Sequence, residues 1–319
     1  MLWLNLLFFV LSCLVLVQSS TFVVRSLSRI AEYFRINEFA VGFIVVAVST
    51  SLPELFVGVT SAFSGNNELA LGNVIGANII NLTLIIGIAA LLAKGIRIRS
   101  KVIKKDFIYM VAIIMVPLLL MWDKALQWYD GLILIAIFVL YIWQMIRQEH
   151  RFRKRIDFVH KKEVGRQVLI GLISLVVLMV SANFVVIFAT KLSVDMNIPA
   201  ILIGLILLAL GTSLPELILD TRAVIEKHQE LAVGDTLGSV ITNSTLVLGV
   251  SALIHPIQTD VFLFFTSALF LVIIAFVFIT FGESERGISW KEGLSLIMLY
   301  LFFIIVQTYM TLLRNGAAV

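Results

Sequence analysis

Long apolar stretches, separated by short polar segments, run along the whole chain. As a helix, each is long enough to cross the hydrocarbon core of a bilayer, which is about 30 Å thick. The first stretch lacks the basic leading segment of a cleaved signal peptide, so we expect it to be a span. The pattern predicts an all-α polytopic membrane protein with ten transmembrane helices, at about 2–24, 38–63, 68–93, 106–122, 129–146, 167–191, 198–224, 230–255, 259–281 and 292–313.

The composition agrees with membrane embedding. Of the 319 residues, 60% are hydrophobic and only 14% are charged, so the chain cannot present a soluble surface. The net charge of +4 reports membrane topology rather than an anionic partner. No basic run is interleaved with aromatic residues, so we expect no binding of nucleic acid. We expect a monomer surrounded by the lipid bilayer.

Lysine and arginine gather in a few connecting loops. Residues 147–166 carry eight of them and residues 94–105 carry six, which predicts that both loops are cytoplasmic. With the N-terminus and the C-terminus outside, 21 of the 24 Lys and Arg residues lie on the inner side. We therefore expect a multi-pass protein of the cell membrane. It is divided into a first five-helix repeat at 1–146, a basic cytoplasmic linker at 147–166 and a second five-helix repeat at 167–319.

One short polar motif occurs twice. Residues 50–54 read Thr-Ser-Leu-Pro-Glu, and the same five residues recur at 212–216, an offset of 162. The offset holds without an insertion from residue 42 to residue 92, and it pairs Gly72 with Gly234, Gly76 with Gly238 and Asn81 with Asn243. This is an internal duplication. Because five helices is an odd number, the second copy enters the membrane from the opposite side, so we expect two inverted five-helix repeats with a binding site between them.

Each motif places a carboxylate and a proline inside an apolar span. A charge at the bilayer centre costs at least about 2.5 kcal/mol, so Glu54 and Glu216 are predicted to be functional. Pro53 has no N–H to donate and its ring obstructs the preceding turn, so we expect the helix to break there. Carbonyl groups freed by the breaks, near Ala47 and Ala209, then become available as oxygen ligands.

The polar residues of the two motifs offer oxygen ligands and no nitrogen or sulphur ligand. The predicted ligand set is Glu54, Glu216, Asn81, Asn243, Thr50, Thr212, Ser51, Ser213 and Ser239, with the carbonyl groups of Ala47 and Ala209. Such oxygens suit a hard cation, Ca²⁺ first and Na⁺ by similar chemistry. All four histidines lie outside these motifs, which argues against a transition metal. A single serine in a membrane helix more often joins two helices, and this alternative stays open for the three serines.

Three charged residues break the symmetry between the copies. Asp235 stands where the first copy has Asn73, and Asp220 stands where it has Gly58, with Arg222 two residues later. Asp235 could add a third charge to the site, but because it comes early in its helix we expect it instead to complement the helix N-terminus or to line a vestibule. Asp220 and Arg222 are expected near the cytoplasmic end, in contact with solvent.

The paired motifs resemble those of the Ca²⁺/cation antiporter superfamily, specifically its prokaryotic sodium/calcium exchanger type. The resemblance rests on residues 50–54 with 72–81 and on residues 212–216 with 234–243. It implies a secondary active antiporter that exchanges Ca²⁺ for Na⁺ by alternating access and needs no cofactor. It also implies that Glu54 and Glu216 share the Ca²⁺ ion, and that the other members of the predicted ligand set complete the Ca²⁺ and Na⁺ sites.

Two positions depart from the pattern of that family. A serine common in its first repeat is Ala77 here, and some prokaryotic members carry an aspartate at the position of Asn243. These departures leave H⁺ open as the coupling ion, as in the Ca²⁺/H⁺ exchangers of the same superfamily, and they leave K⁺ co-transport open. The proton-coupled relatives typically carry a Gly-Asn-Ala-Val-Glu signature in place of this motif, which favours Na⁺.

Functions of other classes fit the sequence less well. An intramembrane protease with Asp220 and Asp235 as its catalytic pair would need a Gly-x-Gly-Asp signature, but residues 232–235 read Ala-Val-Gly-Asp. We therefore expect that the protein is not an enzyme. A cation channel would use the same oxygen ligands, but inverted repeats with broken helices favour alternating access, in which the first helix of each half slides against the rest.

Overall fold

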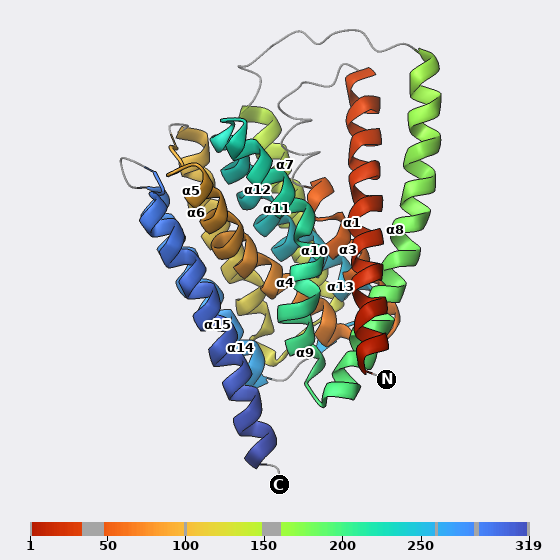
Figure 1. Ribbon diagram of the computed structural model, residues 1–319, viewed down its shortest axis with the longest axis vertical. Coiled ribbons are helices and arrows are strands. Elements are labelled where there is room, and N and C mark those ends of the chain that lie inside the picture. Colours follow the sequence, from red (N-terminus) through yellow and green to blue (C-terminus); the bar gives the residue numbers. More distant parts are fainter. Residues whose placement is uncertain are drawn as a thin grey trace.

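The structure is a computed structural model, and it describes residues 2–33, 48–98, 101–148, 161–258, 261–283 and 287–317. Within these ranges the fold is almost entirely helical (Figure 1). The first half contains α1 (Leu2–Tyr33), α3 (Leu52–Phe63), α4 (Asn67–Ile80), α5 (Ile86–Leu92), α6 (Lys101–Leu120) and α7 (Trp128–Gln148). The second half contains α8 (Lys161–Met196), α9 (Ala200–Ile203), α10 (Ala209–Thr212), α11 (Leu214–Ile225), α12 (Gln229–Thr242), α13 (Leu248–Ile254), α14 (Val261–Gly282) and α15 (Trp290–Ala317).

Short elements join several of these helices. The π-helical turns η1 (Asn81–Ile85), η4 (Gly204–Leu208) and η5 (Asn243–Val247) connect α4 to α5, α9 to α10 and α12 to α13. A 3-10 turn, η2 (Met121–Asp123), follows α6. The strand β1 (Ala125–Leu126) pairs antiparallel with β2 (Ile257–Gln258). π-Helical turns are frequent at functional sites, and η1 and η5 begin at the matching residues Asn81 and Asn243.

The described residues contain eight helices or continuous helix runs that are long and apolar enough to cross a membrane. A ninth candidate is the pair Ala200–Thr212 and Leu214–Ile225, which is bent by 45° at its break. The prediction of an all-α polytopic membrane protein is therefore confirmed. The remaining predicted stretch, 38–63, falls partly on residues 34–47, which lie outside the described ranges; its described part contains the 12-residue helix α3.

The sequence offset of 162 reappears in the helix boundaries. α3 and α11 begin and end at positions 162 apart, and so do α4 and α12, η1 and η5, and α5 and α13. The short strand pairing recurs with a shift of one residue. Ile96 and Ile288, which form an isolated bridge, correspond at this offset to Gln258 and Leu126, whereas Gln258 pairs with the neighbouring Ala125. Thus the duplicated sequence folds into duplicated local structure, including the π-helical turns.

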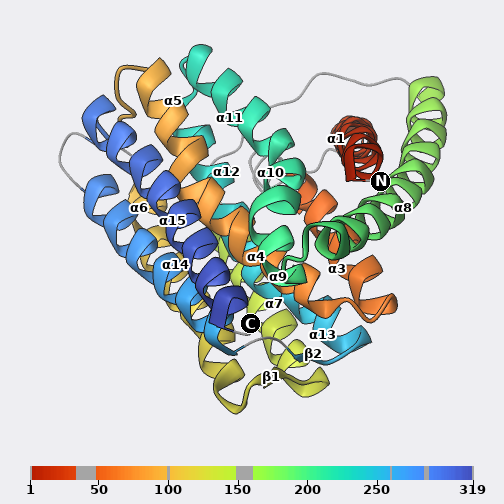
Figure 2. The same ribbon diagram turned by 60° about the horizontal axis from the view of Figure 1, so that its bottom comes forward.

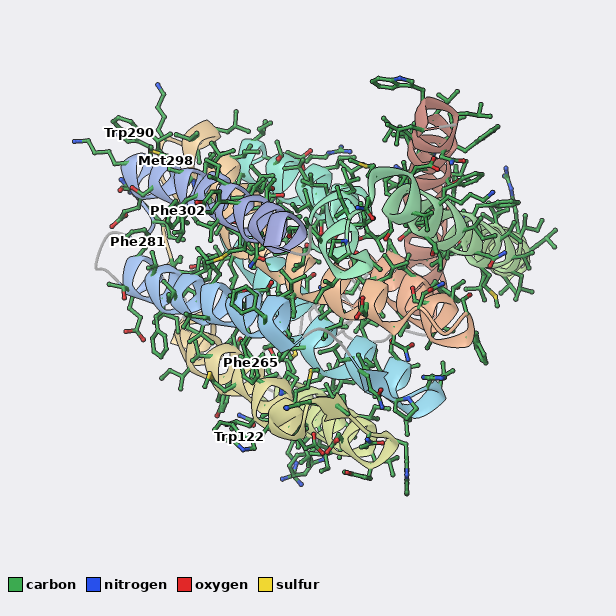
Figure 3. All side chains as sticks on the ribbon, turned by 90° about the horizontal axis from the view of Figure 1, so that it is seen from below. Trp122, Phe265, Phe281, Trp290, Met298 and Phe302 are labelled. Carbon is green, nitrogen blue, oxygen red and sulfur yellow. The ribbon has the colours of Figure 1, made fainter. Side chains whose placement is uncertain are left out.

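The duplicated helices form the centre of the molecule. The runs Asn67–Leu92 and Gln229–Ile254 are the most enclosed candidate spans among the described residues, with 83% and 78% of their apolar windows buried. α1 and α8 lie together at one edge, and α14 and α15 lie at the opposite edge (Figure 1 and Figure 2). Large apolar side chains of the outer helices, such as Met298 and Phe302, point away from the protein (Figure 3). This outward apolar layer is what a lipid-embedded surface requires.

Two glycines of α4 allow the halves to approach each other closely. A Cβ atom at Gly72 would lie 2.3 Å from the carbonyl oxygen of Ile201, and one at Gly76 would lie 2.2 Å from the carbonyl oxygen of Leu205. Both obstructing atoms belong to the backbone of the second half, so any side chain at these positions would force the helices apart. The small-residue face predicted for this helix therefore contacts the interrupted helix of the opposite repeat.

Candidate functional site

Both Thr-Ser-Leu-Pro-Glu motifs interrupt a helix and start a new one. Ser51 precedes α3 with φ −78° and ψ 4°, and Ser213 precedes α11 with φ −83° and ψ 8°. In each case the proline occupies the first turn of the new helix, where its missing N–H is not needed. Glu54 and Glu216 follow immediately, also in the first turn. The break thus places each carboxylate at a helix N-terminus, whose partial positive charge favours an anion.

The two glutamates are completely enclosed by the protein. Both side chains are 0% exposed, and none of their four carboxylate oxygens has a hydrogen-bond partner within 3.5 Å among the described residues, although the Thr212 and Ser213 hydroxyls lie near enough to Glu54 to interact with it. The negative charges of Glu54 and Glu216 are close enough to repel each other. The negative charge of Asp235 repels both of them. A buried carboxylate without a partner is costly, so this arrangement calls for a positively charged ligand between the two groups.

Other buried polar groups without a partner gather in the same motifs. Native proteins leave few such groups, so their position is informative. Within the described part of the chain, the predicted ligands that have such buried, unpartnered polar atoms are Ser51, Ser213, Asn81, Asn243 and the two glutamates. Their exposed fractions are at most 2%, which excludes bulk water as the missing partner. Carboxylate, amide and hydroxyl oxygens together suit a hard cation.

Hydrogen bonds cross between the two repeats in a reciprocal way. Thr212 donates to Oδ1 of Asn73 over 3.0 Å, and Thr50 donates to Oδ1 of Asp235 over 3.2 Å. Each threonine of one motif therefore binds the residue at the matching position of the other repeat. Ser239 also approaches Thr50, with 3.1 Å between their hydroxyl oxygens. The matching position opposite Thr212 is Ala77, which offers no hydroxyl.

The second helix break does not free the carbonyl group that the sequence predicted. The oxygen of Ala209 is not free, because it accepts hydrogen bonds from the Ser213 amide at 3.0 Å and from the Thr212 hydroxyl at 3.3 Å. Ala47 lies outside the described residues. The carbonyl of Ser49, four residues before Pro53, is the one that loses its helical donor, and the Ser20 hydroxyl of α1 reaches it at 3.4 Å.

Asn81 and Asn243 each begin a π-helical turn. These turns, η1 and η5, follow directly on α4 and α12, and they widen the helix by one residue at the asparagine. Asn81 is 1% exposed and Asn243 is 0% exposed. Both amides thus lie at an irregularity of the helix backbone inside the protein, which is where membrane proteins commonly build ligand sites.

Two predictions about the asymmetric residues are wrong. Asp235 neither caps α12 nor lines a vestibule: it is 1% exposed, lies two turns into the helix and accepts the Thr50 hydrogen bond. Asp220 is not solvated: it is 0% exposed and accepts a hydrogen bond of 3.1 Å from Thr236. Its spacing of four residues from Glu216 puts both acids on one face of α11, and that spacing could have indicated its burial. Arg222, in contrast, is exposed as predicted and pairs with Glu226 at 2.8 Å.

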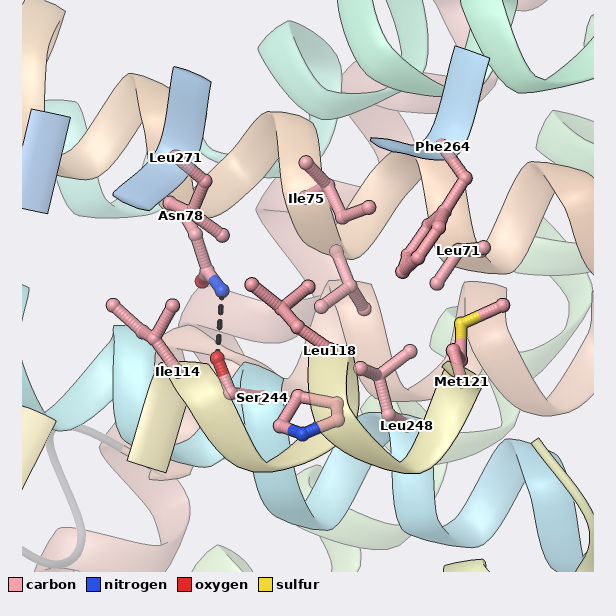
Figure 4. Close-up of a pocket in the computed structure, with 12 residues that line it drawn as sticks. Leu71, Ile75, Asn78, Ile114, Leu118, Met121, Ser244, Leu248, Phe264 and Leu271 are labelled. Carbon is pink, nitrogen blue, oxygen red and sulfur yellow. Dashed lines mark hydrogen bonds between the residues drawn. The ribbon is translucent and has the colours of Figure 1, made fainter. Parts of the chain in front are cut away.

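An apolar pocket lies beside these residues but does not take part in the site. Figure 4 shows it between Leu71, Leu118, Met121 and Phe264, with no acid among the residues that line it. At one end, the Asn78 amide donates to the Ser244 hydroxyl over 2.8 Å. This hydrogen bond joins α4 to η5 and therefore ties the two repeats together next to the asparagines.

The histidines of the described residues take no part in this centre. Within the described ranges, no three His, Cys, Asp or Glu side chains converge on one point. His255 binds Asn67 near the end of α13, and His150 and His160 lie outside the described residues. The two motifs thus form a buried, acidic, oxygen-lined centre between two interrupted helices, which is suited to a hard cation that sheds its water.

The chain is similar to proteins of known families. A family described as "Sodium/calcium exchanger protein" matches residues 4–147 and 166–309. The sodium/calcium exchanger MaX1 of Methanosarcina acetivorans is 26% identical over 355 aligned positions, which cover 97% of this chain and 100% of that protein. The inner membrane protein YrbG of Escherichia coli K12 is 30% identical over 264 positions, covering 79% of this chain and 80% of YrbG.

Solved structures agree with these matches. A structure of the sodium-calcium exchanger NCX_Mj soaked with Na⁺ and Sr²⁺ is 25% identical to the chain and superposes with a TM-score of 0.69. The superposition covers 96% of this chain and 99% of that protein. The similarity therefore extends over both halves and the region between the two motifs.

Proposed function

Since this chain belongs to the sodium/calcium exchanger protein family, we propose that it is a secondary active antiporter that exchanges Ca²⁺ for Na⁺ across the membrane. The observation that carries the proposal is the pair of buried carboxylates, Glu54 and Glu216, whose oxygens have no partner among the described residues. Two negative charges match one divalent ion, and the same charges attract Na⁺ when Ca²⁺ leaves. The similar proteins MaX1 and NCX_Mj are sodium/calcium exchangers, and we propose that this chain is likewise a transporter and not an enzyme.

In this proposal the duplicated motifs hold the transported ions. Glu54 and Glu216 bind Ca²⁺ from opposite sides, and Ser51, Ser213, Asn81 and Asn243 turn their free oxygens to it or to neighbouring Na⁺ ions. Thr50, Thr212 and Ser239, with the carbonyls of Ala47 and Ala209, complete the sites. The reciprocal hydrogen bonds between the repeats support this assignment, because they bring both motifs to one centre. For Ala209, ion binding would have to replace one of its present hydrogen bonds.

We further propose ten transmembrane helices in two inverted repeats, at 1–146 and 167–319, joined by the linker at 147–166. The repeated helix boundaries and the separate family matches to 4–147 and 166–309 support this division. The first helices of the halves, α1 and α8, pack chiefly against each other at one edge of the molecule (Figure 2). Sliding of this pair past the interrupted helices would open the site to one side of the membrane at a time.

The orientation follows from the positively charged loops. We propose a cell-membrane protein whose basic segments 94–105 and 147–166 face the cytoplasm and whose two termini lie outside. A monomer suffices for this mechanism, because both motifs that form the site belong to one chain.

Transport assays in proteoliposomes test the coupling ion. We expect Na⁺-loaded vesicles to take up Ca²⁺ when they are diluted into Na⁺-free medium, and we expect uptake to stop when the Na⁺ gradient is collapsed. The measurement is ⁴⁵Ca²⁺ accumulation at constant pH, repeated with a pH gradient and no Na⁺. Uptake driven by the pH gradient alone would indicate Ca²⁺/H⁺ exchange, and uptake that needs no counter-ion gradient would indicate a channel.

The asymmetry at Ala77 gives a narrower prediction. Ser239 interacts with Thr50, whereas Ala77, at the matching position near Thr212, is completely buried and cannot. We expect Ala77→Ser to supply the missing hydroxyl and to change the Na⁺ concentration for half-maximal exchange by roughly fivefold, the effect of about 1 kcal/mol. The apparent affinity for Ca²⁺ should change less.

The buried Ala70 of the same helix provides the matched control, Ala70→Ser, which should leave the Na⁺ dependence unchanged. The same Na⁺ dependence in Ala77→Ser and in the wild type would place Ala77 outside every ion site.

A further inference from the structure

A hydrogen bond ties α1 to the first interrupted helix. The Ser20 hydroxyl donates to the carbonyl oxygen of Ser49 over 3.4 Å, and both residues are buried. Ser49 immediately precedes Thr50, the first residue of the motif that ends with Glu54. Pro53 lacks the amide N–H that would otherwise bond to this carbonyl, so the buried oxygen needs a donor from another segment. The hydroxyl of Ser20 supplies that donor.

Ser20 departs from the usual behaviour of serine and threonine in a membrane helix. Such hydroxyls commonly bond to a carbonyl of the preceding turn of their own helix. In α1, Ser12 and Thr21 do so over 2.7 Å and 3.0 Å, and Ser19 bonds to the carbonyl of Leu16 over 2.9 Å. Ser20 lies directly between Ser19 and Thr21 but bonds to another element. Its hydrogen bond therefore depends on where α1 stands relative to the motif.

α1 also lies against the second interrupted helix. A Cβ atom at Gly211 would be 2.7 Å from Sγ of Cys13, so the thiol packs directly on the backbone of that glycine. Gly211 matches Ser49 at the offset of 162, and it likewise lies four residues before a proline, Pro215. α1 further contacts α3, α10 and α11. One helix thus touches both breaks, in each case at the residue whose carbonyl loses its amide donor to a proline.

α8, the first helix of the second repeat, carries different groups at the matching positions. At the offset of 162, Leu175 corresponds to Cys13 and Ala182 corresponds to Ser20. Neither side chain has a hydrogen-bond donor. Ala182 therefore cannot give the carbonyl of Gly211 the hydrogen bond that Ser20 gives to the carbonyl of Ser49.

We propose that Ser20 is a positioning residue that holds α1 in its present register against the first motif. This inference deepens the proposed exchange function and rests on it for its transport readout. A slide of α1 past the interrupted helices must break the Ser20 bond, because a hydrogen bond of 3.4 Å is already near its upper length. Ser20 can then turn to a carbonyl of its own helix, whereas the carbonyl of Ser49 loses its donor. The bond therefore favours the conformation of this structure over the one in which α1 has moved.

The chain contains its own reporter of this movement. Cys13 is its single cysteine, and it is 4% exposed where it packs on Gly211. A small thiol reagent, N-ethylmaleimide, reaches the sulphur atom when α1 moves away from α10. If this movement is fast compared with the reaction, the labelling rate is proportional to the population of the displaced state. No cysteine has to be introduced for the measurement.

We expect Ser20→Ala to raise the labelling rate of Cys13 roughly fivefold in detergent without Ca²⁺ or Na⁺, because the loss of one ordinary hydrogen bond changes a two-state equilibrium by about that factor. The matched control is Ser19→Ala, which removes a neighbouring buried hydroxyl whose bond stays within α1. This control should be labelled at the rate of the wild type. Ser20→Thr keeps a hydroxyl at the position and should be labelled slowly.

Transport gives a second readout, which a general loosening of the protein would not change. The Ca²⁺ concentration for half-maximal exchange is measured from each face of the membrane, in right-side-out and in inside-out vesicles. The apparent affinity on each face scales with the fraction of the protein that is open to it. Ser20→Ala should therefore change the ratio of the two concentrations by roughly fivefold, whereas Ser19→Ala should leave the ratio unchanged.

Three results would overturn the role of Ser20. They are labelling of Ser20→Ala at the wild-type rate, equally fast labelling of Ser20→Ala and Ser19→Ala, and an unchanged ratio of half-maximal concentrations despite faster labelling, which would make Ser20 a packing residue only. Absence of Na⁺-driven Ca²⁺ uptake by the wild type would instead contradict the proposed function. The labelling rates need no transport, so they would still decide in that case whether Ser20 holds α1 in place.

Discussion

Glu54→Gln and Glu216→Gln are each expected to abolish Ca²⁺ transport while the protein stays folded. Glutamine keeps the size of the side chain but removes the charge that attracts the ion. Loss of one partner from a buried, charge-assisted contact costs about 3 kcal/mol, so the affinity for Ca²⁺ should fall by roughly a hundredfold or more. Both carboxylates are enclosed and lack a partner among the described residues, so bulk water cannot replace the lost ligand.

The measurement is Na⁺-driven ⁴⁵Ca²⁺ uptake at several Ca²⁺ concentrations, together with the melting temperature without Ca²⁺. Removal of an uncompensated buried charge should raise the stability of the ion-free protein, whereas the stabilisation produced by added Ca²⁺ should disappear. Glu283→Gln, an exposed acid at the end of α14, is the control and should transport normally. Normal transport by Glu54→Gln or by Glu216→Gln would show that the substituted carboxylate is not needed to bind the transported Ca²⁺.

Gly76→Ala should cause a large loss of stability. Its new Cβ atom would lie 2.2 Å from the backbone oxygen of Leu205 and 2.7 Å from the Cβ atom of Ala209. A backbone atom cannot rotate away, so α4 must separate from the interrupted helix of the other repeat. Overpacking of this kind costs about 1–3 kcal/mol and shifts the backbone. Because α4 carries Asn81 at its end, we expect transport to fail as well.

Gly165→Ala in α8 is the matched control for this prediction. No atom lies within 4 Å of the position that its Cβ would occupy, and alanine favours a helix over glycine by about 1 kcal/mol. Thermal unfolding in detergent should therefore show a lower melting temperature for Gly76→Ala and an equal or higher one for Gly165→Ala. Equal melting temperatures for Gly76→Ala and the wild type would show that the two repeats are not in close contact there.

Hydropathy and the internal repeat predicted most of the helical framework. The spans expected at 68–93 and 230–255 are found at Asn67–Leu92 and Gln229–Ile254, because a helix that must fill the bilayer leaves a long and readable apolar run. The helix breaks at the two prolines could also be predicted from the sequence, because a proline lacks the backbone N–H donor in any surroundings. The identities at an offset of 162 extended to the helix boundaries themselves.

Features that depend on contacts between distant segments could not be predicted from the sequence. The hydropathy of α12 gives no reason to place Asp235 against Thr50, because that contact exists only when the two repeats fold together. The burial of Asp220 follows from the face of α11 that meets its neighbours, which the sequence spacing hints at but does not determine. The π-helical turns at Asn81 and Asn243 have no distinct residue pattern, so they too emerged only from the fold.

The reciprocal bonds of Thr50 with Asp235 and of Thr212 with Asn73 have an evolutionary consequence. Neither half of the duplicated gene encodes a complete motif environment, since each threonine finds its acceptor in the other half. After the duplication, the two halves could no longer change independently. A substitution at position 73 removes or alters the hydrogen-bond acceptor of Thr212, and one at position 235 does the same for Thr50. Correlated changes across the 162-residue interval, rather than within each half, are therefore the expected record of selection in descendants of this gene.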